Sequence, residues 1–156
     1  MPASKNIHPN LAAFLDMIAW SEGTSRIAGS DDGYNVLVGG KLFTGYADHP
    51  RVLVPLPRLG IKSTAAGRYQ LLSKYFDAYK KRLGLTDFSP ACQDAIAIQQ
   101  IRECGALDEI HAGKFADAVG LCKHIWASLP GAGYGQHEQK FASLQDAYTR
   151  AGGVVA

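Results

Sequence analysis

Residues 11–22 read LAAFLDMIAWSE, and this stretch decides the fold. Its large apolar residues follow the i, i+3, i+4, i+7 spacing of a helix face that packs on a core: Leu11, Phe14, Leu15 and Ile18. We therefore expect a helix over about Leu11–Ser21, with Asn10 as its N-cap. Glu22 comes four residues after the last of these and continues the same face. A carboxyl group at such a position is costly unless it is paired or used.

Glu22 has the setting that acid catalysis of glycoside cleavage requires. The catalytic acid must hold its proton near neutral pH, and burial against apolar groups such as Trp20 raises the pKa of a carboxyl. Ser21 can help to orient the side chain. A helix-terminal glutamate that points into solvent is the alternative, and the helix pattern alone favours that alternative.

Most glycosidases use a second carboxylate. Here it would come from Asp31, Asp32 or Asp48. The first two precede Gly33, and an Asp-Asp-Gly sequence is typical of a plain turn. None of the three is compelling, so a mechanism with a single acid stays open.

The composition excludes several classes of function. Sixteen Lys and Arg residues against fourteen Asp and Glu residues give a net charge of +2, too mild to indicate a nucleic-acid partner. The three cysteines (Cys92, Cys104 and Cys122) form no close pair and fit small buried thiols. The histidines lack metal-ligand spacing, so we expect no metal, no cofactor and solvated side chains: His8, His49, His111, His124 and His137.

The N-terminal apolar stretch does not resemble a secretion signal, because Asp16 interrupts it. No apolar run approaches the roughly 20 residues of a membrane span. We therefore expect synthesis in the cytoplasm without membrane insertion.

A β-containing part is expected over about residues 25–62, which are rich in Gly, Asp and Pro. Tyr34–Val38 and Lys41–Phe43 predict two short strands around a Gly-Gly turn. The proline-punctuated segment Asp48–Lys62 fits a binding loop or a plain surface loop equally well. In Gly67-Arg68-Tyr69-Gln70, small residues would admit a ligand, but the pattern alone favours an ordinary helix start.

The rest of the chain predicts helices, listed here in order: from Ser63 or Thr64 to Gly84, from Ser89 to Gly105, Leu107–His111, Phe115–Leu129, and about Glu138–Ala151. The Gly-rich run before the last helix lacks the residues of a phosphate-binding loop. We expect one domain over residues 1–156, built as two lobes. Its fold class is α+β, mostly helical with a small β-hairpin in the N-terminal lobe.

Four blocks of the sequence resemble the lambda-type phage endolysins, and they lie in the expected order over nearly the whole chain. They are residues 14–24, 33–40, 66–72 and 125–136. The resemblance implies a lysozyme-like fold with a glycan groove between the lobes. It also implies a lytic transglycosylase that cleaves the β-1,4 bond between N-acetylmuramic acid and N-acetylglucosamine. The product would carry a 1,6-anhydro end, and the purpose would be host cell lysis.

The resemblance places the catalytic acid at Glu22. The substrate-binding candidates are Ser21, Tyr34, Asn35, Gly67, Tyr69, Gln70, Tyr134 and Gln136. At Asn35 the family pattern leads us to expect Asp, and we interpret the amide as a sugar-binding group. The loops Arg51–Lys62 and Pro130–Gln136 would form the two lips of the groove.

The expected partners are peptidoglycan strands and a holin-type protein that permeabilises the membrane. The enzyme would then act in the periplasm as a monomer. Two other functions stay open. One is a true muramidase, using water activated by Asp31, Asp32 or Asp48. The other is a non-catalytic peptidoglycan-binding module, although a pure binder has no use for a buried acid.

Overall fold

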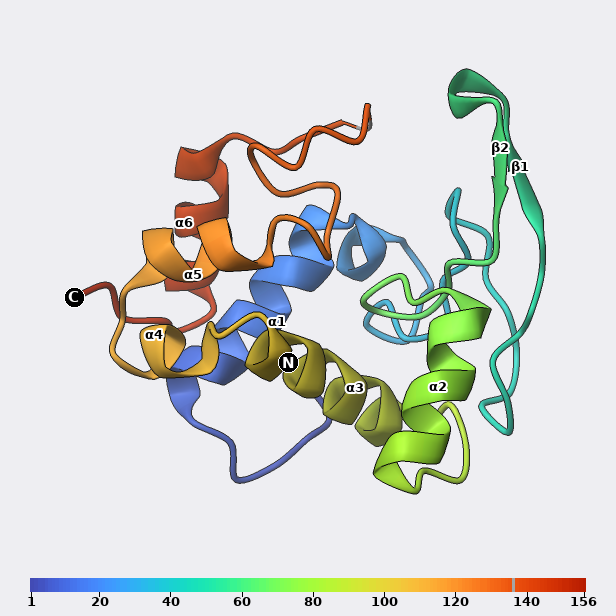
Figure 1. The fold of residues 1–156 in the computed structure, drawn as a ribbon, viewed down its shortest axis with the longest axis horizontal. Helices are drawn as coiled ribbons and strands as arrows, with labels where there is room; N and C mark the ends of the chain where they lie inside the picture. The colour runs from blue at the N-terminus through green and yellow to red at the C-terminus, as the bar shows by residue number, and fades with distance from the viewer. Residues whose placement is uncertain (136) are drawn as a thin grey trace.

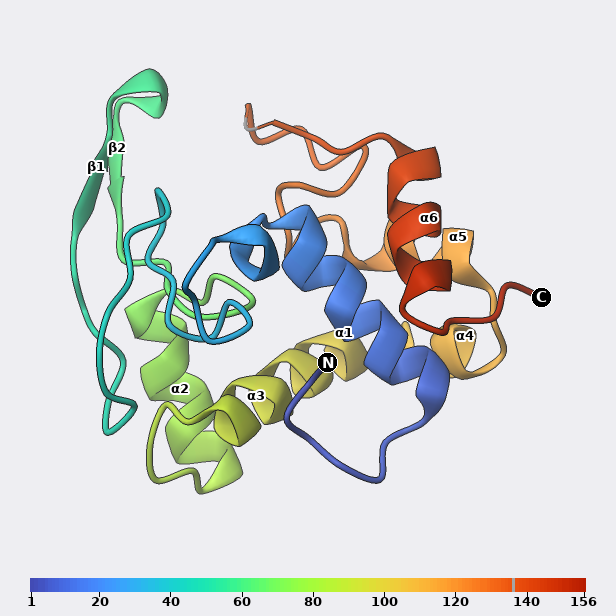
Figure 2. The same cartoon turned by 180° about the vertical axis from the view of Figure 1, so that it is seen from behind.

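The computed structural model describes residues 1–135 and 137–156, and within them it contains six α-helices and one two-stranded antiparallel sheet. In Figure 1, α1 (Pro9–Ser21), α4 (Leu107–His111), α5 (Phe115–Cys122) and α6 (Phe141–Arg150) gather on one side. The other side holds α2 (Ser73–Leu83) and the sheet of β1 (Val54–Leu56) and β2 (Ile61–Ser63). The helix α3 (Pro90–Glu103) runs from one side to the other, which Figure 2 shows from behind.

The buried apolar residues form two clusters. The larger one surrounds α1, whose predicted apolar face is buried in full at Leu11, Phe14, Leu15 and Ile18. The smaller one includes Phe76 of α2 and Ile96 of α3. The predicted α+β class is therefore confirmed, with a helical part around α1 and a smaller part that carries the hairpin.

The N-cap of α1 is His8, so the predicted cap at Asn10 was wrong. Nδ1 of His8 accepts a hydrogen bond from the backbone N–H of Asn10 at 3.1 Å, and Pro9 occupies the first helical turn. The side chain of Asn10 instead donates to the backbone oxygen of Ile110 at 3.1 Å. It thereby ties α1 to α4.

The regular hairpin lies twenty residues beyond the predicted one. The segment predicted to form strands makes only isolated bridges, such as Val36 with Leu42. The sheet is formed within the proline-rich segment, where Val54 pairs with Ser63 and Leu56 with Ile61. A proline is tolerated in an edge strand because its missing N–H faces away from the partner. A two-stranded sheet consists only of edge strands, so Pro55 does not prevent pairing.

Three of the predicted helix boundaries were wrong, two of them because a local contact competes with the helix. The first helix after the sheet begins at Ser73, since Gln70 has φ 54° and Ala66 bridges Leu71 instead. The helix α5 ends at Cys122 rather than Leu129. The helix α6 begins after Glu138, whose carboxylate accepts hydrogen bonds from two glycine N–H groups. The predicted start of α3 at Ser89-Pro90 and the bounds of α4 are confirmed.

Burial differs from the prediction at one histidine and two cysteines, while the other four histidines are exposed as predicted. His49 is only 2% exposed, and its Nε2 lies 2.8 Å from the backbone oxygen of Leu71. It packs against Phe88 with ring centroids 4.9 Å apart, so it is a core residue. Of the cysteines, Cys122 is buried while the other two are partly exposed. No helix in the described ranges is long and apolar enough to cross a membrane.

Candidate active site

A groove of about 850 Å³ lies between the hairpin and the loop that joins α5 to α6. We call the hairpin segment 54–63 the upper lip and the segment 123–135 the lower lip; Figure 1 shows the hairpin at the right edge of the view and the loop to its left, nearer the centre. Both predicted lips contribute to the lining: Arg51–Lys62 through the residues from Leu56 to Ile61, and Pro130–Gln136 through Gly135. Among the described residues that line the groove, Glu22 is the one with a carboxylate. The described lining residues are, in chain order, Glu22, Val38, Gly39, Leu56, Pro57, Arg58, Leu59, Ile61, Ser63, Ala65, Gln70, Leu72, Ile125, Trp126, Ala127, Gly135 and His137.

Glu22 is held at the end of α1 by backbone and side-chain hydrogen bonds. Its N–H donates to the backbone oxygen of Ile18 at 2.8 Å, which extends the helix by one residue. Its Oε1 accepts from the hydroxyl of Ser128 at 2.8 Å. Ser21 in turn donates to the Ser128 hydroxyl at 2.7 Å, so Ser21 orients the acid through Ser128. Sequence reasoning found Ser21 and missed Ser128, which is 106 residues away from Glu22 along the chain.

The electrostatic setting of Glu22 keeps a large share of it protonated up to neutral pH. Burial raises its pKa from the ordinary value of 4.5 to about 7, and the hydrogen bonds from Ser128 oppose part of this rise. A carboxyl with such a pKa is matched to proton transfer at neutral pH. It can give up a proton and afterwards accept one.

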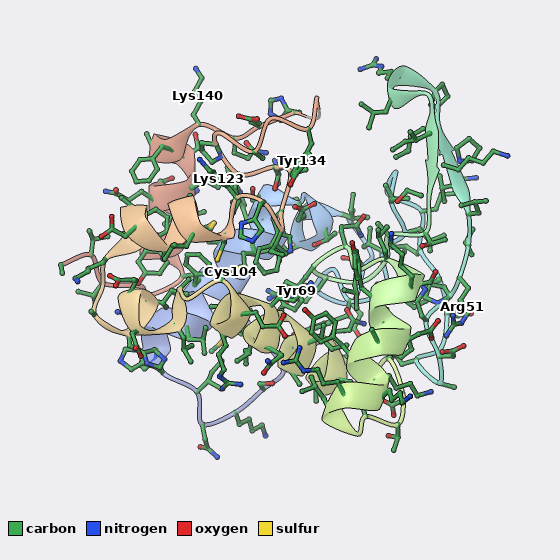
Figure 3. All side chains as sticks on the ribbon, viewed as in Figure 1. Arg51, Tyr69, Cys104, Lys123, Tyr134 and Lys140 are labelled. Atoms are coloured by element: carbon green, nitrogen blue, oxygen red, sulfur yellow. The ribbon has the colours of Figure 1, made fainter. Side chains whose placement is uncertain are left out.

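Tyr34 and Tyr69 support the site from within the core. Both hydroxyls donate to Oδ1 of Asp94, at 2.8 Å and 2.7 Å, and Asp94 is fully buried. Figure 3 marks Tyr69 in the interior of the molecule. Its backbone oxygen accepts from the indole N–H of Trp126 at 3.1 Å, so it anchors one wall of the groove. Neither tyrosine is among the residues that line the groove itself.

Of the remaining substrate-binding candidates in the N-terminal half, Gln70 lines the groove. The side chain of Asn35 accepts from the N–H of Asp31 at 2.7 Å and thereby closes a turn. Gly67 has φ +83°, and a Cβ there would lie 2.4 Å from Oε1 of Gln93. The close approach that requires glycine is therefore made by Gln93, a protein side chain.

The lower lip carries the last two candidates. Tyr134 is 54% exposed, and its hydroxyl donates to the backbone oxygen of His124 at 3.0 Å. Figure 3 places it on the lower lip above the end of α1 in that view. Gln136 lies outside the described residues.

The three aspartates considered as a second carboxylate lie elsewhere and have partners. Asp31 accepts from the hydroxyl of Tyr46 at 2.7 Å, Asp32 pairs with the N-terminal amine at 2.8 Å, and Asp48 pairs with Arg51 at 2.8 Å. None of the three lines the groove. Among the described residues, no group of three or more His, Cys, Asp or Glu side chains is placed to hold a metal ion.

A lysozyme-like fold with one buried acid in its groove defines a class: enzymes that cleave cell-wall glycans. The Endolysin family model matches residues 12–155, and the chain belongs to this family. It is 60% identical to the endolysin of Escherichia phage lambda over 146 residues, which cover 92% of this chain and 91% of that protein. It is 50% identical to the endolysin of Escherichia phage P2, with 97% of this chain and 98% of that protein covered.

Solved structures agree with the sequence comparison. A bacteriophage lambda lysozyme complexed with a chitohexasaccharide superposes with a TM-score of 0.92 at 56% identity, covering 98% of this chain and 100% of that chain. A second lysozyme from bacteriophage lambda superposes with a TM-score of 0.88 at 55% identity, with the same coverage. The protein is therefore a peptidoglycan-degrading, lysozyme-like enzyme of phage type.

The raised pKa of Glu22 predicts a pH-dependent cost to folding. Unfolded Glu22 loses its proton near 4.5 and folded Glu22 near 7, so the folded state loses stability as pH rises between these values. The cost at about pH 8 is up to about 3 kcal/mol. Glu22→Gln removes it, so the variant should gain stability over the wild type as pH rises. Urea unfolding of both proteins at about pH 4 and about pH 8 measures this; an unchanged difference would contradict the burial of the acid.

Proposed function

We propose that the enzyme is a lytic transglycosylase in which Glu22 acts first as acid and then as base. The observation that carries the proposal is that Glu22 is the one carboxylate on the described lining of the groove. A retaining or inverting hydrolase needs a second carboxylate across the scissile bond. A transglycosylase does not, because its nucleophile belongs to the substrate.

The steps follow from the state of the carboxyl. Protonated Glu22 donates its proton to the glycosidic oxygen between N-acetylmuramic acid and N-acetylglucosamine, and positive charge develops at C1 of the muramic acid. The ionised Glu22 then accepts the proton of that sugar's C6 hydroxyl as its oxygen attacks C1. The product is a 1,6-anhydro ring. Since the attacking hydroxyl is part of the same sugar, the step gains a large proximity advantage.

The binding residues are assigned to two kinds of position. Gln70 contacts the glycan directly from the groove lining, and Tyr134 contacts it from the lower lip. Gln136, which lies outside the described residues, stays a binding candidate on the resemblance alone. The remaining candidates shape the groove: Ser21 through Ser128, Asn35 and Gly67 through turns, and Tyr34 and Tyr69 through Asp94. The bacteriophage lambda lysozyme was solved in complex with a chitohexasaccharide, which supports a polymer of N-acetylated sugars as the ligand of this groove.

A cell-wall assay separates this proposal from hydrolysis. Purified enzyme should reduce the turbidity of outer-membrane-permeabilised cells without a matching rise in reducing ends, because the anhydro product has none. Clearing with one new reducing end per cut would indicate a muramidase. Binding without clearing would indicate a non-catalytic module.

The two lips should be mobile without substrate and become ordered around it. The lower lip has Gly131, Gly133 and Gly135 with φ between 74° and 79°, a backbone conformation that other residues resist. Hydrogen exchange of Glu22→Gln with and without a glycan strand measures this. Equal, strong protection in both states would mean a preformed groove.

Tyr134→Ala should weaken glycan binding more than it lowers the stability of the fold.

We propose that export depends on a holin-type protein that permeabilises the inner membrane. The monomeric enzyme would wait in the cytoplasm and act on the wall after release. Cells that express it alone should stay intact until a membrane-permeabilising agent is added. Prompt lysis without such an agent, measured as loss of optical density, would contradict the proposed route.

A further inference from the structure

The carboxylate of Glu138 ties two glycines of the lower lip together. Its Oε1 accepts a hydrogen bond from the N–H of Gly131 at 2.9 Å, and its Oε2 accepts one from the N–H of Gly133 at 3.0 Å. Both glycines have positive φ, 79° and 75°, and holding them there costs backbone freedom. The N–H groups of Gly133 and Gly131 hold the pKa of Glu138 below its ordinary value, so both hydrogen bonds are charge-assisted at neutral pH.

The residue that follows Glu138 joins this segment to the proposed acid. The N–H of Gln139 donates to the backbone oxygen of Ser128 at 2.8 Å, and its side-chain amide donates to the backbone oxygen of Ser21 at 3.4 Å. The hydroxyls of Ser21 and Ser128 are the ones that orient Glu22. Ser128 is thus held at its backbone by Gln139 and at its hydroxyl by Ser21. The first of the tied glycines comes three residues after Ser128, so Glu138 acts beside this backbone pair.

We propose that Glu138 is a positioning residue for the acid: by tying the two glycines to the residue before Gln139, it holds Ser128 in place, and Ser128 holds Glu22. The tie favours the ordered conformation of the lower lip, in which the acid is oriented. Glu138 is not among the described residues that line the groove, so it acts through the lip and not on the glycan. This deepens the proposed function and rests on it, because it takes Glu22 as the proton donor.

The pH dependence of the rate separates this role from a merely structural one. Burial raises the pKa of Glu22 to about 7, and the hydrogen bonds from Ser128 oppose part of this rise because they favour the charged form. If Glu138 holds Ser128, its removal weakens these bonds and raises the pKa of Glu22 further. The rate falls as Glu22 loses its proton, so the alkaline limb of the pH–rate profile should move to higher pH while kcat decreases.

Other consequences of removing Glu138 act in the opposite direction. Entry of water into the site would reduce the burial of Glu22 and lower its pKa. Loss of the negative charge of Glu138 would also lower it, and physiological salt weakens this effect. The ionisable groups beside the segment or on the groove lining are kept in every variant, so their influence cancels in the comparison: Arg58, Lys123, His124 and His137.

The test compares initial rates on soluble glycan strands over roughly pH 5 to 9 at physiological ionic strength. Glu138→Ala should lower kcat about 3- to 10-fold, the scale of lost hydrogen bonds, and move the alkaline limb upward. Glu138→Gln keeps the shape and one acceptor oxygen, so its shift should lie between those of Glu138→Ala and the wild type. In a Ser128→Ala background, Glu138→Ala should have almost no further effect on kcat, because the residue through which it acts has lost its hydroxyl.

The matched control is Lys140→Ala, two positions along the chain. Its side chain is exposed and points away from the molecule in Figure 3, so its removal should change neither kcat nor the limb. Urea unfolding of each variant checks that it is folded under the assay conditions. If Glu138→Ala is not folded, Glu138→Gln alone decides the direction of the shift.

Two results would overturn the proposal. A limb that stays in place or moves to lower pH would mean that Glu138 does not maintain the hydrogen bonds of Ser128. Additive losses of kcat in the double variant would mean that Glu138 and Ser128 act independently. Failure of the proposed function is seen separately, as a wild-type profile without an alkaline limb near pH 7 or a wild-type enzyme that forms no anhydro end.

Discussion

Replacing Glu22 by Gln should lower the rate of wall cleavage at least about 100-fold, the usual scale of lost acid–base catalysis. The amide keeps the shape of the side chain and still accepts from Ser128, so the variant should fold and bind glycan. The wild-type rate should also fall as pH rises through about 7, where Glu22 loses its proton. Initial rates of turbidity loss, with binding measured in parallel, provide the test.

The control for this prediction is Glu109→Gln, which removes a carboxylate paired with Lys114 on the surface of α4. It should leave the rate unchanged. Near-wild-type lysis by Glu22→Gln would mean that another group supplies the proton.

Ser128→Ala should lower the cleavage rate less than Glu22→Gln does, because it removes only the hydrogen bond that orients the acid.

Replacing Arg68 by Met should lower the free energy of unfolding by about 3–5 kcal/mol, as expected when one partner of a buried ion pair is removed. Arg68 is 1% exposed, and its guanidinium lies 2.6 Å from Oδ1 of Asp16 and 3.0 Å from the hydroxyl of Tyr69. It also donates to the backbone oxygen of Asp32 at 2.9 Å. Its loss would leave Asp16 and Asp32 with the N-terminal amine as their remaining ion-pair partner.

Arg51→Met is the matched control. Arg51 makes as many ion pairs as Arg68, with Asp48 and Asp77, but all three side chains are well exposed. Exposed pairs contribute about 0–1 kcal/mol, so this variant should unfold almost like the wild type. Chemical denaturation of the three proteins at neutral pH compares them. Equal losses for Arg68→Met and Arg51→Met would contradict the account of the buried cluster.

The sequence predicts those parts of the fold that depend on local pattern. The apolar face of α1 is buried as its spacing indicates, and Ser89 caps α3 as its position before Pro90 indicates. The strands were misplaced because their pairing depends on the partner segment as well as on propensity. The hairpin Val54–Ser63 contains a proline that lowers the local signal, yet its two strands pair with each other alone.

The candidate site was predictable where one residue breaks a pattern. Glu22 stands on an apolar face, and this contrast is visible in twelve residues of sequence. Ser128, Arg68 and Asp94 give no such signal, because their roles depend on partners 25 to 106 residues away. The interior position of Tyr34 and Tyr69 has the same cause, since a tyrosine in a core and one in a groove look alike in sequence.

The origin of the oxygen atoms in the product tests the central claim most directly. Wild-type enzyme would digest peptidoglycan strands in water enriched in a heavy oxygen isotope, and the masses of the released fragments would be measured. If the muramic acid's own C6 hydroxyl attacks C1 with Glu22 as its base, each new end is anhydro and carries no heavy oxygen. One heavy oxygen at each new muramic acid end would mean that water is the nucleophile, and the single-acid account would be wrong.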